Sequence, residues 1–266
     1  PVGNRLGWFL PGLLWLAMGF FQPLTIVSGW AVVAMYVLLR GILCLRQAKD
    51  AQPGCRAAWR AEFLRAVVTG LISAPWVVYN FAAFQIDPYL RGWAQQNLIL
   101  SPPVGDYLLA YGVVLILAVT GVRAVWKDHS RAAILLAGWV IAFPLLAYFP
   151  YPLQRRLPEG LWVALAVLGT AGFASLQGFW KKLATPFLAL SFFPALLLLL
   201  GALLSTWTPQ APLFLPAYEV KAFQFVREYA ARDAVVLASF EVSNRIAAWA
   251  PVRTITGHGP ESVGAE

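Results

Sequence analysis

Charged residues are scarce in this chain. Asp, Glu, Lys and Arg make up 12% of the 266 residues, whereas an ordinary soluble domain has about 25%. Together with an apolar share of 60%, this scarcity excludes a water-soluble globule for most of the chain, and it excludes intrinsic disorder as well. Two cysteines are too few for a small domain stabilised by disulfides. The chain contains instead a series of long apolar runs.

Seven apolar runs have about the length of a membrane-spanning helix, which needs about 20 mostly apolar residues with a range of about 17–25. They are Leu6–Phe21, Leu24–Leu45, Ala66–Phe84, Tyr107–Val122, Ala132–Phe149, Leu161–Phe179 and Pro186–Trp207. None has the polar face that a surface helix of a soluble protein turns to water. Residues 1–208 are therefore predicted to form an all-α polytopic membrane bundle of about seven transmembrane helices.

The basic residues are distributed unevenly between the predicted connections. If the N-terminus is on the inner side, 12 of the 20 Lys and Arg lie on that side and five lie in the C-terminal tail. The three in outer connections are Arg91, Arg155 and Arg156. The positive-inside rule then predicts a multi-pass protein of the plasma (inner) membrane with an extracytoplasmic tail. The net charge of +8 follows from this bias and indicates no nucleic-acid partner.

The tail, residues 209–266, alternates between helical and strand patterns. Ala217–Arg232 has one apolar face, as in an amphipathic helix, and Ala234–Phe240 has the length and composition of a strand. Asn244–Trp249 is predicted to be a short helix and Val252–Thr256 a second strand. This order predicts a small parallel α/β domain outside the membrane. The chain lacks an initiator methionine and ends just after a turn-like stretch, so we expect a fragment with a truncated tail domain.

The first long outer connection, Gln85–Asp106, is rich in amides, aromatic rings and isolated carboxylates. It is longer than the usual helix connection of about 2–8 residues. Asp87 and Arg91 are its charged candidates for binding a sugar or a polar headgroup. Alternatively, Pro88–Leu98 forms an interfacial helix in the headgroup plane. The two interpretations are compatible, because such a helix can form the wall of a site.

The next outer connection contains adjacent arginines, Arg155 and Arg156, on the side where the charge bias disfavours them. Guanidinium groups bind phosphate or pyrophosphate through paired hydrogen bonds. We therefore expect the pair to bind a lipid-linked phosphate, with hydrogen bonds added by Gln154 and Tyr151. Glu159 belongs to the same candidate set, and it also suits the N-terminus of the next helix. The alternatives are contacts with ordinary lipid phosphates, or a structural pair between Arg156 and Glu159.

No metal site is predicted. Cys44 and Cys55 fall on the inner side, where a disulfide is not expected, and their spacing matches no common metal pattern. His258 and Glu261 follow the second predicted strand and could form an acid–base pair or bind a metal. The glycines and the proline around them favour a structural turn instead.

Three stretches of sequence carry a resemblance to a known family. They are YPLQRRLPEG, FQIDPYLRGWAQQN followed by SPP, and AVVLASFEVSN followed by GHGPES. They resemble the C-terminal half of large bacterial polytopic membrane proteins of the GT-C glycosyltransferase type, or of uncharacterised relatives of these enzymes. The resemblance covers most of the chain, although no single stretch is diagnostic of chemistry.

The resemblance implies an integral membrane enzyme that transfers a sugar from a polyprenyl-phosphate-linked donor on the outer face. Its partners are then membrane lipids and the lipid-linked donor. The family's catalytic carboxylate usually lies in the first external loop, and the first external turn here, Gln22–Pro23, has no acid. We therefore expect the catalytic loop, and any divalent metal ion, in a part that precedes this chain. Asp87 has no clear match in the family.

The alternative is a non-catalytic, transport or ligase-type polytopic membrane protein that handles lipid-linked saccharides. A transporter uses ionisable residues at the depth of the bilayer centre. The seven runs are almost free of charge, with Arg40 near an inner end, which argues against ion coupling. A polysaccharide ligase also uses external arginines, so the arginine pair fits both functions.

Overall fold

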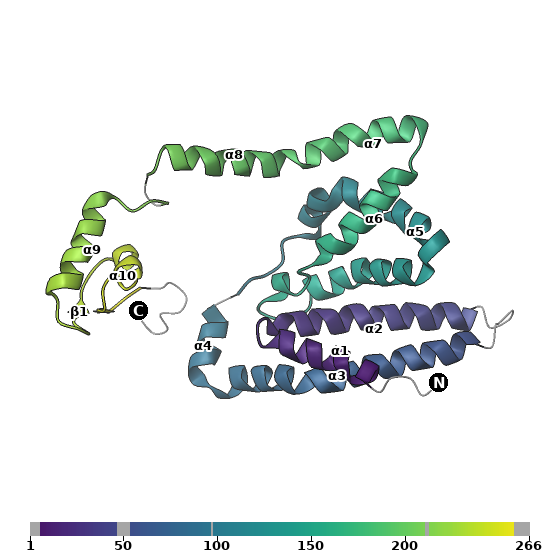
Figure 1. Ribbon diagram of the computed structural model, residues 1–266, viewed down its shortest axis with the longest axis horizontal. Helices are drawn as coiled ribbons and strands as arrows, with labels where there is room; N and C mark the ends of the chain where they lie inside the picture. The colour runs from purple at the N-terminus through teal and green to yellow at the C-terminus, as the bar shows by residue number, and fades with distance from the viewer. Residues whose placement is uncertain (1–5, 47–53, 97, 211–212, 258–266) are drawn as a thin grey trace. The chain divides into compact units, whose positions relative to one another are not determined.

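A computed structural model describes residues 6–46, 54–96, 98–210 and 213–257 (Figure 1). The chain divides into two compact units. The first comprises Pro1–Ala94 and Leu98–Leu188, and the second comprises Gln95–Asn97 and Ala189–Glu266. Helices dominate the first unit, and the second adds two short strands to its helices.

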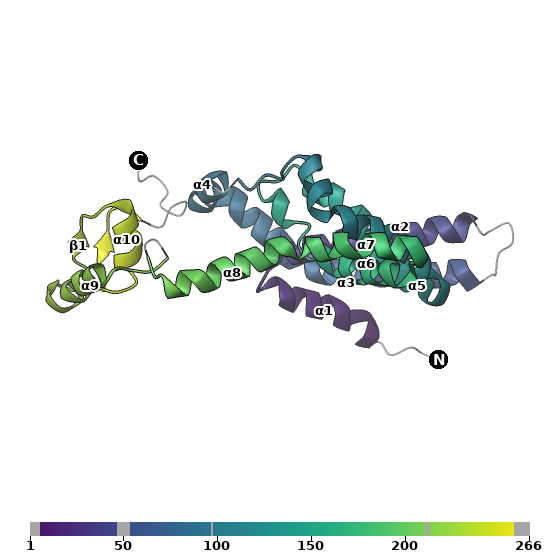
Figure 2. The same cartoon turned by 90° about the horizontal axis from the view of Figure 1, so that it is seen from above.

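Three helices open the first unit and lie side by side (Figures 1 and 2). They are α1 (Leu6–Gly19), α2 (Pro23–Arg46) and α3 (Gly54–Ile86). Two indole groups of α3 hold it to the other two helices. Trp59 Nε1 donates a hydrogen bond to the Val37 carbonyl of α2 at 2.9 Å, and Trp76 Nε1 donates to the Gly19 carbonyl of α1 at 2.6 Å. Tryptophan thereby contributes both apolar contact area and a directed hydrogen bond within the bundle.

The fourth and fifth apolar runs are two halves of one broken helix. Helix α5 (Val104–Ala147) has 44 residues, and at 1.5 Å per residue a straight helix of that length would measure about 66 Å. That is about twice the 30 Å hydrocarbon thickness of a bilayer. The backbone leaves helical geometry at His129, with φ −138° and ψ 62°. The Tyr107 and Phe143 rings lie edge to face with centroids 4.9 Å apart, so the two halves run antiparallel.

Helix α6 (Leu161–Ser175) packs closely against α5. A Cβ atom on Gly121 of α5 would overlap the Leu168 carbonyl, and one on Gly172 of α6 would overlap the Leu117 carbonyl. Small residues allow such close approach of helix backbones in membrane proteins, where packing rather than hydrophobicity drives association. The two glycines therefore fix how α5 and α6 fit together.

The long apolar helices indicate a membrane-embedded, multi-pass protein, in agreement with the prediction from the sequence. Four helical segments are long and apolar enough to cross a membrane: Pro23–Arg46, Gly54–Ile86, Val104–Ala147 and Gly178–Trp207. The last is formed by α7 (Gly178–Ser191) and α8 (Phe193–Trp207). Helices α1 and α6 are apolar but shorter. Large apolar side chains are widely exposed on these helices, as on a surface that faces lipid.

The expectation that Cys44 and Cys55 do not pair is wrong, because a disulfide joins them. The hairpin of α2 and α3 brings the last turn of one helix beside the first turn of the other, with the two Cα atoms 5.9 Å apart. This separation is normal for a disulfide. The prediction considered only the redox state of the compartment and overlooked the geometry of the hairpin.

The second unit ends in a small strand–helix–strand arrangement. After α9 (Ala217–Tyr229) come β1 (Val235–Val236), α10 (Phe240–Ile246) and β2 (Arg253–Thr254). The two strands pair in parallel, with Val235 opposite Arg253 and Val236 opposite Thr254. The predicted order is therefore present. A buried cluster of Phe223, Ile246 and Ala250 holds α9 to α10 and the segment after it.

The boundaries in this region differ from the prediction. Phe240 begins a helix instead of ending a strand, because Ser239 Oγ accepts a hydrogen bond from the Val242 amide at 3.5 Å and caps α10. The predicted helix at Asn244–Trp249 therefore begins four residues earlier. His258 and Glu261 lie outside the described residues.

Alanine at Gly121 or Gly172 tests the contact between α5 and α6. Each added Cβ overlaps a backbone carbonyl, so we expect the free energy of unfolding to fall by about 1–3 kcal/mol, as for other overpacked sites. Gly112→Ala is the matched control in α5, because nothing lies within 4 Å of the position of its Cβ. Unfolding in mixed micelles, followed by circular dichroism, measures the difference. Equal stability of the three variants would contradict the close contact.

Candidate functional site

Three connections meet at one end of the first unit. The Ile99 amide donates a hydrogen bond to the Pro152 carbonyl at 2.8 Å, and the Arg155 amide donates to the Ile99 carbonyl at 3.3 Å. From the turn between α1 and α2, Gln22 Nε2 donates to Glu159 Oε2 at 3.4 Å. The connections that the charge bias assigned to the outer side of the membrane therefore lie together at one end of the bundle.

Gln154 strengthens this junction. It begins the 3₁₀ turn η2 (Gln154–Arg156), and its Oε1 accepts a hydrogen bond from the Ser101 amide at 3.2 Å. The Tyr107 hydroxyl donates to Ser101 Oγ at 3.1 Å, and the Tyr148 hydroxyl donates to the Pro102 carbonyl at 2.8 Å. Side chains and backbone thus tie the segment before α5 to the loop after it.

A cavity of about 470 Å³ opens at this junction. Its volume falls within the range of about 300–1,000 Å³ that is usual for small-molecule sites. Residues from both connections and from the nearby ends of α5 and α6 line it: Pro102, Asp106, Tyr107, Ala110, Tyr111, Phe143, Arg155, Pro158, Glu159, Gly160, Leu161 and Trp162. The lining therefore combines one arginine and two carboxylates with four aromatic rings.

The aromatic rings form a connected wall. Tyr107 stacks nearly parallel to Tyr111 with ring centroids 6.0 Å apart, and both meet Phe143 edge to face. Tyr111 also meets Trp162 of α6 edge to face at 5.2 Å. Edge-to-face pairs are favourable contacts beyond the area that they bury. The wall is therefore held in a defined shape by α5 and α6.

The two carboxylates lie at helix N-termini, where the helix dipole favours negative charge. Asp106 is in the first turn of α5. Glu159 precedes Gly160, which caps α6 with φ 92°, a left-handed conformation that glycine adopts without strain. Arg155 is exposed, and its backbone is held by Ile99. One guanidinium and two carboxylates are thus placed by separate elements around a single cavity.

Asp87 and Arg91, two of the predicted ligand-binding residues, have local structural roles. Asp87 Oδ1 accepts hydrogen bonds from the Tyr89 amide at 2.8 Å and the Leu90 amide at 3.1 Å, so it caps α4 (Pro88–Gln96). The Arg91 guanidinium donates to the Gln85 carbonyl near the end of α3. Neither side chain lines the cavity. The helix expected in this connection is present as α4.

The arginine pair is divided by the structure. Arg155 lines the cavity, whereas Arg156 does not. Among the residues that the structure describes, Arg156 makes no ion pair with Glu159. Tyr151 packs against a buried apolar cluster, and burial raises the pKa of its phenol above the ordinary value. Of the predicted set, Arg155 and Glu159 therefore reach the cavity, while Gln154 and Tyr151 support the loop beside it.

The sequence pattern placed Asp106 among the carboxylates of the Gln85–Asp106 connection but did not single it out as a binding residue, and it did not predict the aromatic wall. A usable signal was present, because Asp106 opens an apolar run and Tyr107 and Tyr111 follow at helical i, i+4 spacing. Trp162 gave no such signal, since only the packing of α6 against α5 brings it to Tyr111. Within the described ranges, no group of three His, Cys, Asp or Glu residues is placed to hold a metal ion.

Comparisons with protein families, with curated proteins and with solved structures found no match for this chain. The resemblance to GT-C-type glycosyltransferases therefore stays a prediction. The functional assignment depends on the chemistry of the cavity and on the helices that carry it.

Gln154→Ala tests whether this residue holds the junction. The Ser101 amide loses its acceptor, so we expect the free energy of unfolding to fall by about 1 kcal/mol. The loop after α5 should also become more sensitive to limited proteolysis. Gln210→Ala is the control, because the exposed Gln210 side chain makes no hydrogen bond within the described part of the chain. Equal proteolysis of both variants would contradict the role of Gln154.

Proposed function

We propose that the cavity beside Arg155 binds a polyprenyl-phosphate-linked sugar, and that the protein is a GT-C-type glycosyltransferase acting on the outer face of the membrane. One observation carries this proposal: a single cavity combines a guanidinium, two carboxylates and an aromatic wall at the end of apolar helices. Phosphate is recognised by arginine, and sugar hydroxyls by carboxylates. The exposed apolar helix surfaces offer a path for the isoprenoid chain.

The side chains suggest distinct roles in sugar transfer. Arg155 stabilises the negative charge that grows on the phosphate as its bond to the sugar C1 atom breaks. The acceptor hydroxyl forms the new bond to C1 and gives its proton to a carboxylate. Glu159 already accepts a hydrogen bond from Gln22, whereas Asp106 makes no side-chain bond within the described residues, so we assign the base to Asp106. This differs from the expectation that the catalytic acid precedes this chain.

The proposed function also requires the first 208 residues to cross the membrane seven times. The two halves of α5 count as separate crossings, which gives seven together with α1, α2, α3, α6 and the α7–α8 segment. Helices α1 and α6 have 14 and 15 residues, so each needs its flanking residues to complete a crossing. The 12-to-3 distribution of basic residues favours a position outside the plasma membrane for the Arg155 cavity and for the tail after Trp207.

Arg155→Ala should weaken binding of a polyprenyl-phosphate-sugar by about ten- to hundredfold, because a charge-assisted hydrogen bond to the phosphate is lost. Arg156→Ala is the matched control, since Arg156 is its neighbour in η2 but does not line the cavity. Arg155→Lys should recover part of the affinity, because it keeps the charge and loses the paired hydrogen bonds. Binding and consumption of the donor are measured on the full chain in liposomes.

Equal losses in the two alanine variants would contradict the assignment to Arg155. Asp106→Asn separates the enzyme from its alternative, a non-catalytic or ligase-type protein that handles lipid-linked saccharides. A transferase with Asp106 as base keeps donor binding but loses most of its turnover in this variant. Unchanged turnover would place the base elsewhere and leave the cavity as a binding site.

Maleimide labelling of Cys44 and Cys55 tests the orientation of the chain in the membrane. If the connection between α2 and α3 is on the inner side, the reducing cytosol opens the disulfide, and a membrane-permeant maleimide labels both thiols in intact cells without added reductant. A membrane-impermeant maleimide should leave them unlabelled even after reduction of the cell surface. Labelling by the impermeant reagent only after reduction would reverse the orientation and place the cavity on the cytosolic side.

A further inference from the structure

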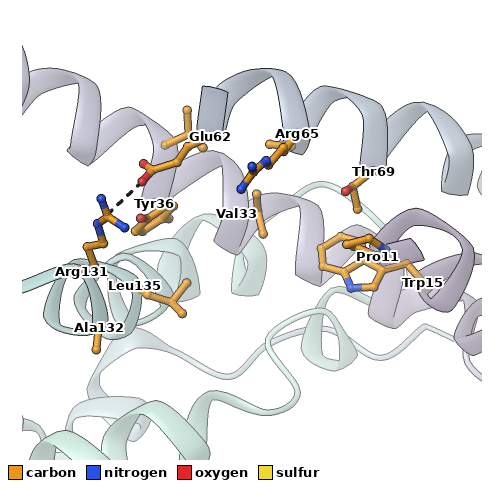
Figure 3. A pocket seen from close by; sticks show the side chains of 12 residues that line it. Pro11, Trp15, Val33, Tyr36, Glu62, Arg65, Thr69, Arg131, Ala132 and Leu135 are labelled. Carbon is orange, nitrogen blue, oxygen red and sulfur yellow. Dashed lines mark ion pairs between the residues drawn. The ribbon is translucent and has the colours of Figure 1, made fainter. Parts of the chain in front are cut away.

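A second cavity, of about 450 Å³, lies among α1, α2, α3 and the second half of α5. Figure 3 shows Glu62 and Arg65 projecting toward it from α3, with Arg131 facing Glu62 from α5. The remainder of the lining is mostly apolar and includes Trp15 and Leu135. The cavity thus has a charged rim and an apolar wall.

The rim contains more positive than negative charge. Glu62 pairs with Arg40 at 3.3 Å and with Arg131 at 3.9 Å, so a single carboxylate is shared by two guanidiniums. Arg65 makes no ion pair within the described residues, and its guanidinium lies 5.2 Å from the centre of the Trp8 ring. The rim itself has two arginines, Arg65 and Arg131, and one acid, Glu62, whose charge is also offset by Arg40 of α2, so the rim favours an anionic group.

The polar side chains of α3 lie on one face of the helix. Glu62, Arg65 and Thr69 are spaced i, i+3 and i+7, and all three line the cavity. Arg65 directly precedes the apolar run Ala66–Phe84 and is ten residues from the middle of that run. At 1.5 Å per residue this distance is about 15 Å, which is half the hydrocarbon thickness of a bilayer. Arg65 therefore lies at the depth of the lipid headgroups.

We propose that this cavity binds an anionic phospholipid from the leaflet on the side of the α2–α3 connection. Arg65 and Arg131 hold the headgroup phosphate, and Thr69 adds a hydroxyl donor. An acyl chain follows the apolar wall beside Trp15 and Leu135. The charge, the depth and the apolar lining favour a lipid over a soluble phosphate, because a soluble phosphate has no apolar part to contact the apolar wall. The site belongs to a different part of the bundle from the Arg155 cavity, and the argument for it does not depend on the proposed sugar transfer.

Native mass spectrometry of the full chain in detergent tests the proposal, with phosphatidylglycerol and phosphatidylcholine as probes. The wild-type chain should retain phosphatidylglycerol in preference to phosphatidylcholine. The double variant Arg65→Gln with Arg131→Gln should bind phosphatidylglycerol about tenfold more weakly, because charge-assisted hydrogen bonds to the phosphate are lost. The double variant Arg123→Gln with Lys127→Gln removes the same charge from the same side outside the cavity, and it should bind as the wild type does.

Val33→Phe is a second test that does not depend on the folding of the arginine variant. It keeps every charge and fills the apolar part of the cavity, so it should also lower phosphatidylglycerol retention. Equal retention of the two lipids, or equal losses in the two double variants, would overturn the site. Displacement of phosphatidylglycerol by millimolar inorganic phosphate would overturn the lipid as its occupant. Donor binding at the Arg155 cavity, measured on the same variants, should remain unchanged and keeps the two proposals distinguishable.

Discussion

The close contact of α5 and α6 at Gly121 and Gly172 determines the shape of the Arg155 cavity. Asp106 and the two tyrosines of the wall come from the start of α5, whereas Trp162 and the loop with Arg155 and Glu159 adjoin α6. A shift between the two helices would separate the aromatic wall from the charged loop. Lipid provides no hydrophobic force to hold two apolar helices together, so their backbones must fit closely to fix the position of a polar site.

The break at His129 gives α5 a part in both cavities. The first half contributes Asp106 and Tyr107 to the Arg155 cavity. Arg131, two positions after the break, reaches Glu62 at the rim of the other cavity. A continuous helix of this length would project far beyond a bilayer. The break turns the chain back along itself and places the two charged sites at opposite ends of the first unit.

Apolar run length predicted the helices of the bundle well, because lipid leaves an apolar segment few structures other than a helix. The alternation of patterns likewise predicted that two short strands of the tail pair in parallel, although it did not predict which residues lie opposite one another. Side-chain roles were harder to predict. Asp87 was chosen as a ligand for its charge, yet it caps α4. Arg155 and Arg156 are equivalent in sequence, and only the turn between α5 and α6 directs one of them to the cavity. The pairing of Cys44 with Cys55 depends on the α2–α3 hairpin, which run length does not reveal.

The disulfide also constrains how the α2–α3 hairpin can lose structure. It joins two residues with a sequence separation of 11. In the chain-entropy model, a loop of this length restricts the unfolded chain and thereby stabilises the folded hairpin by about 3 kcal/mol. When the bond is formed, α2 and α3 cannot separate at that end, even if α1 and α5 detach from them. We therefore expect the oxidised hairpin to resist local opening at that end more than the reduced hairpin does, because reduction of this single bond removes the constraint.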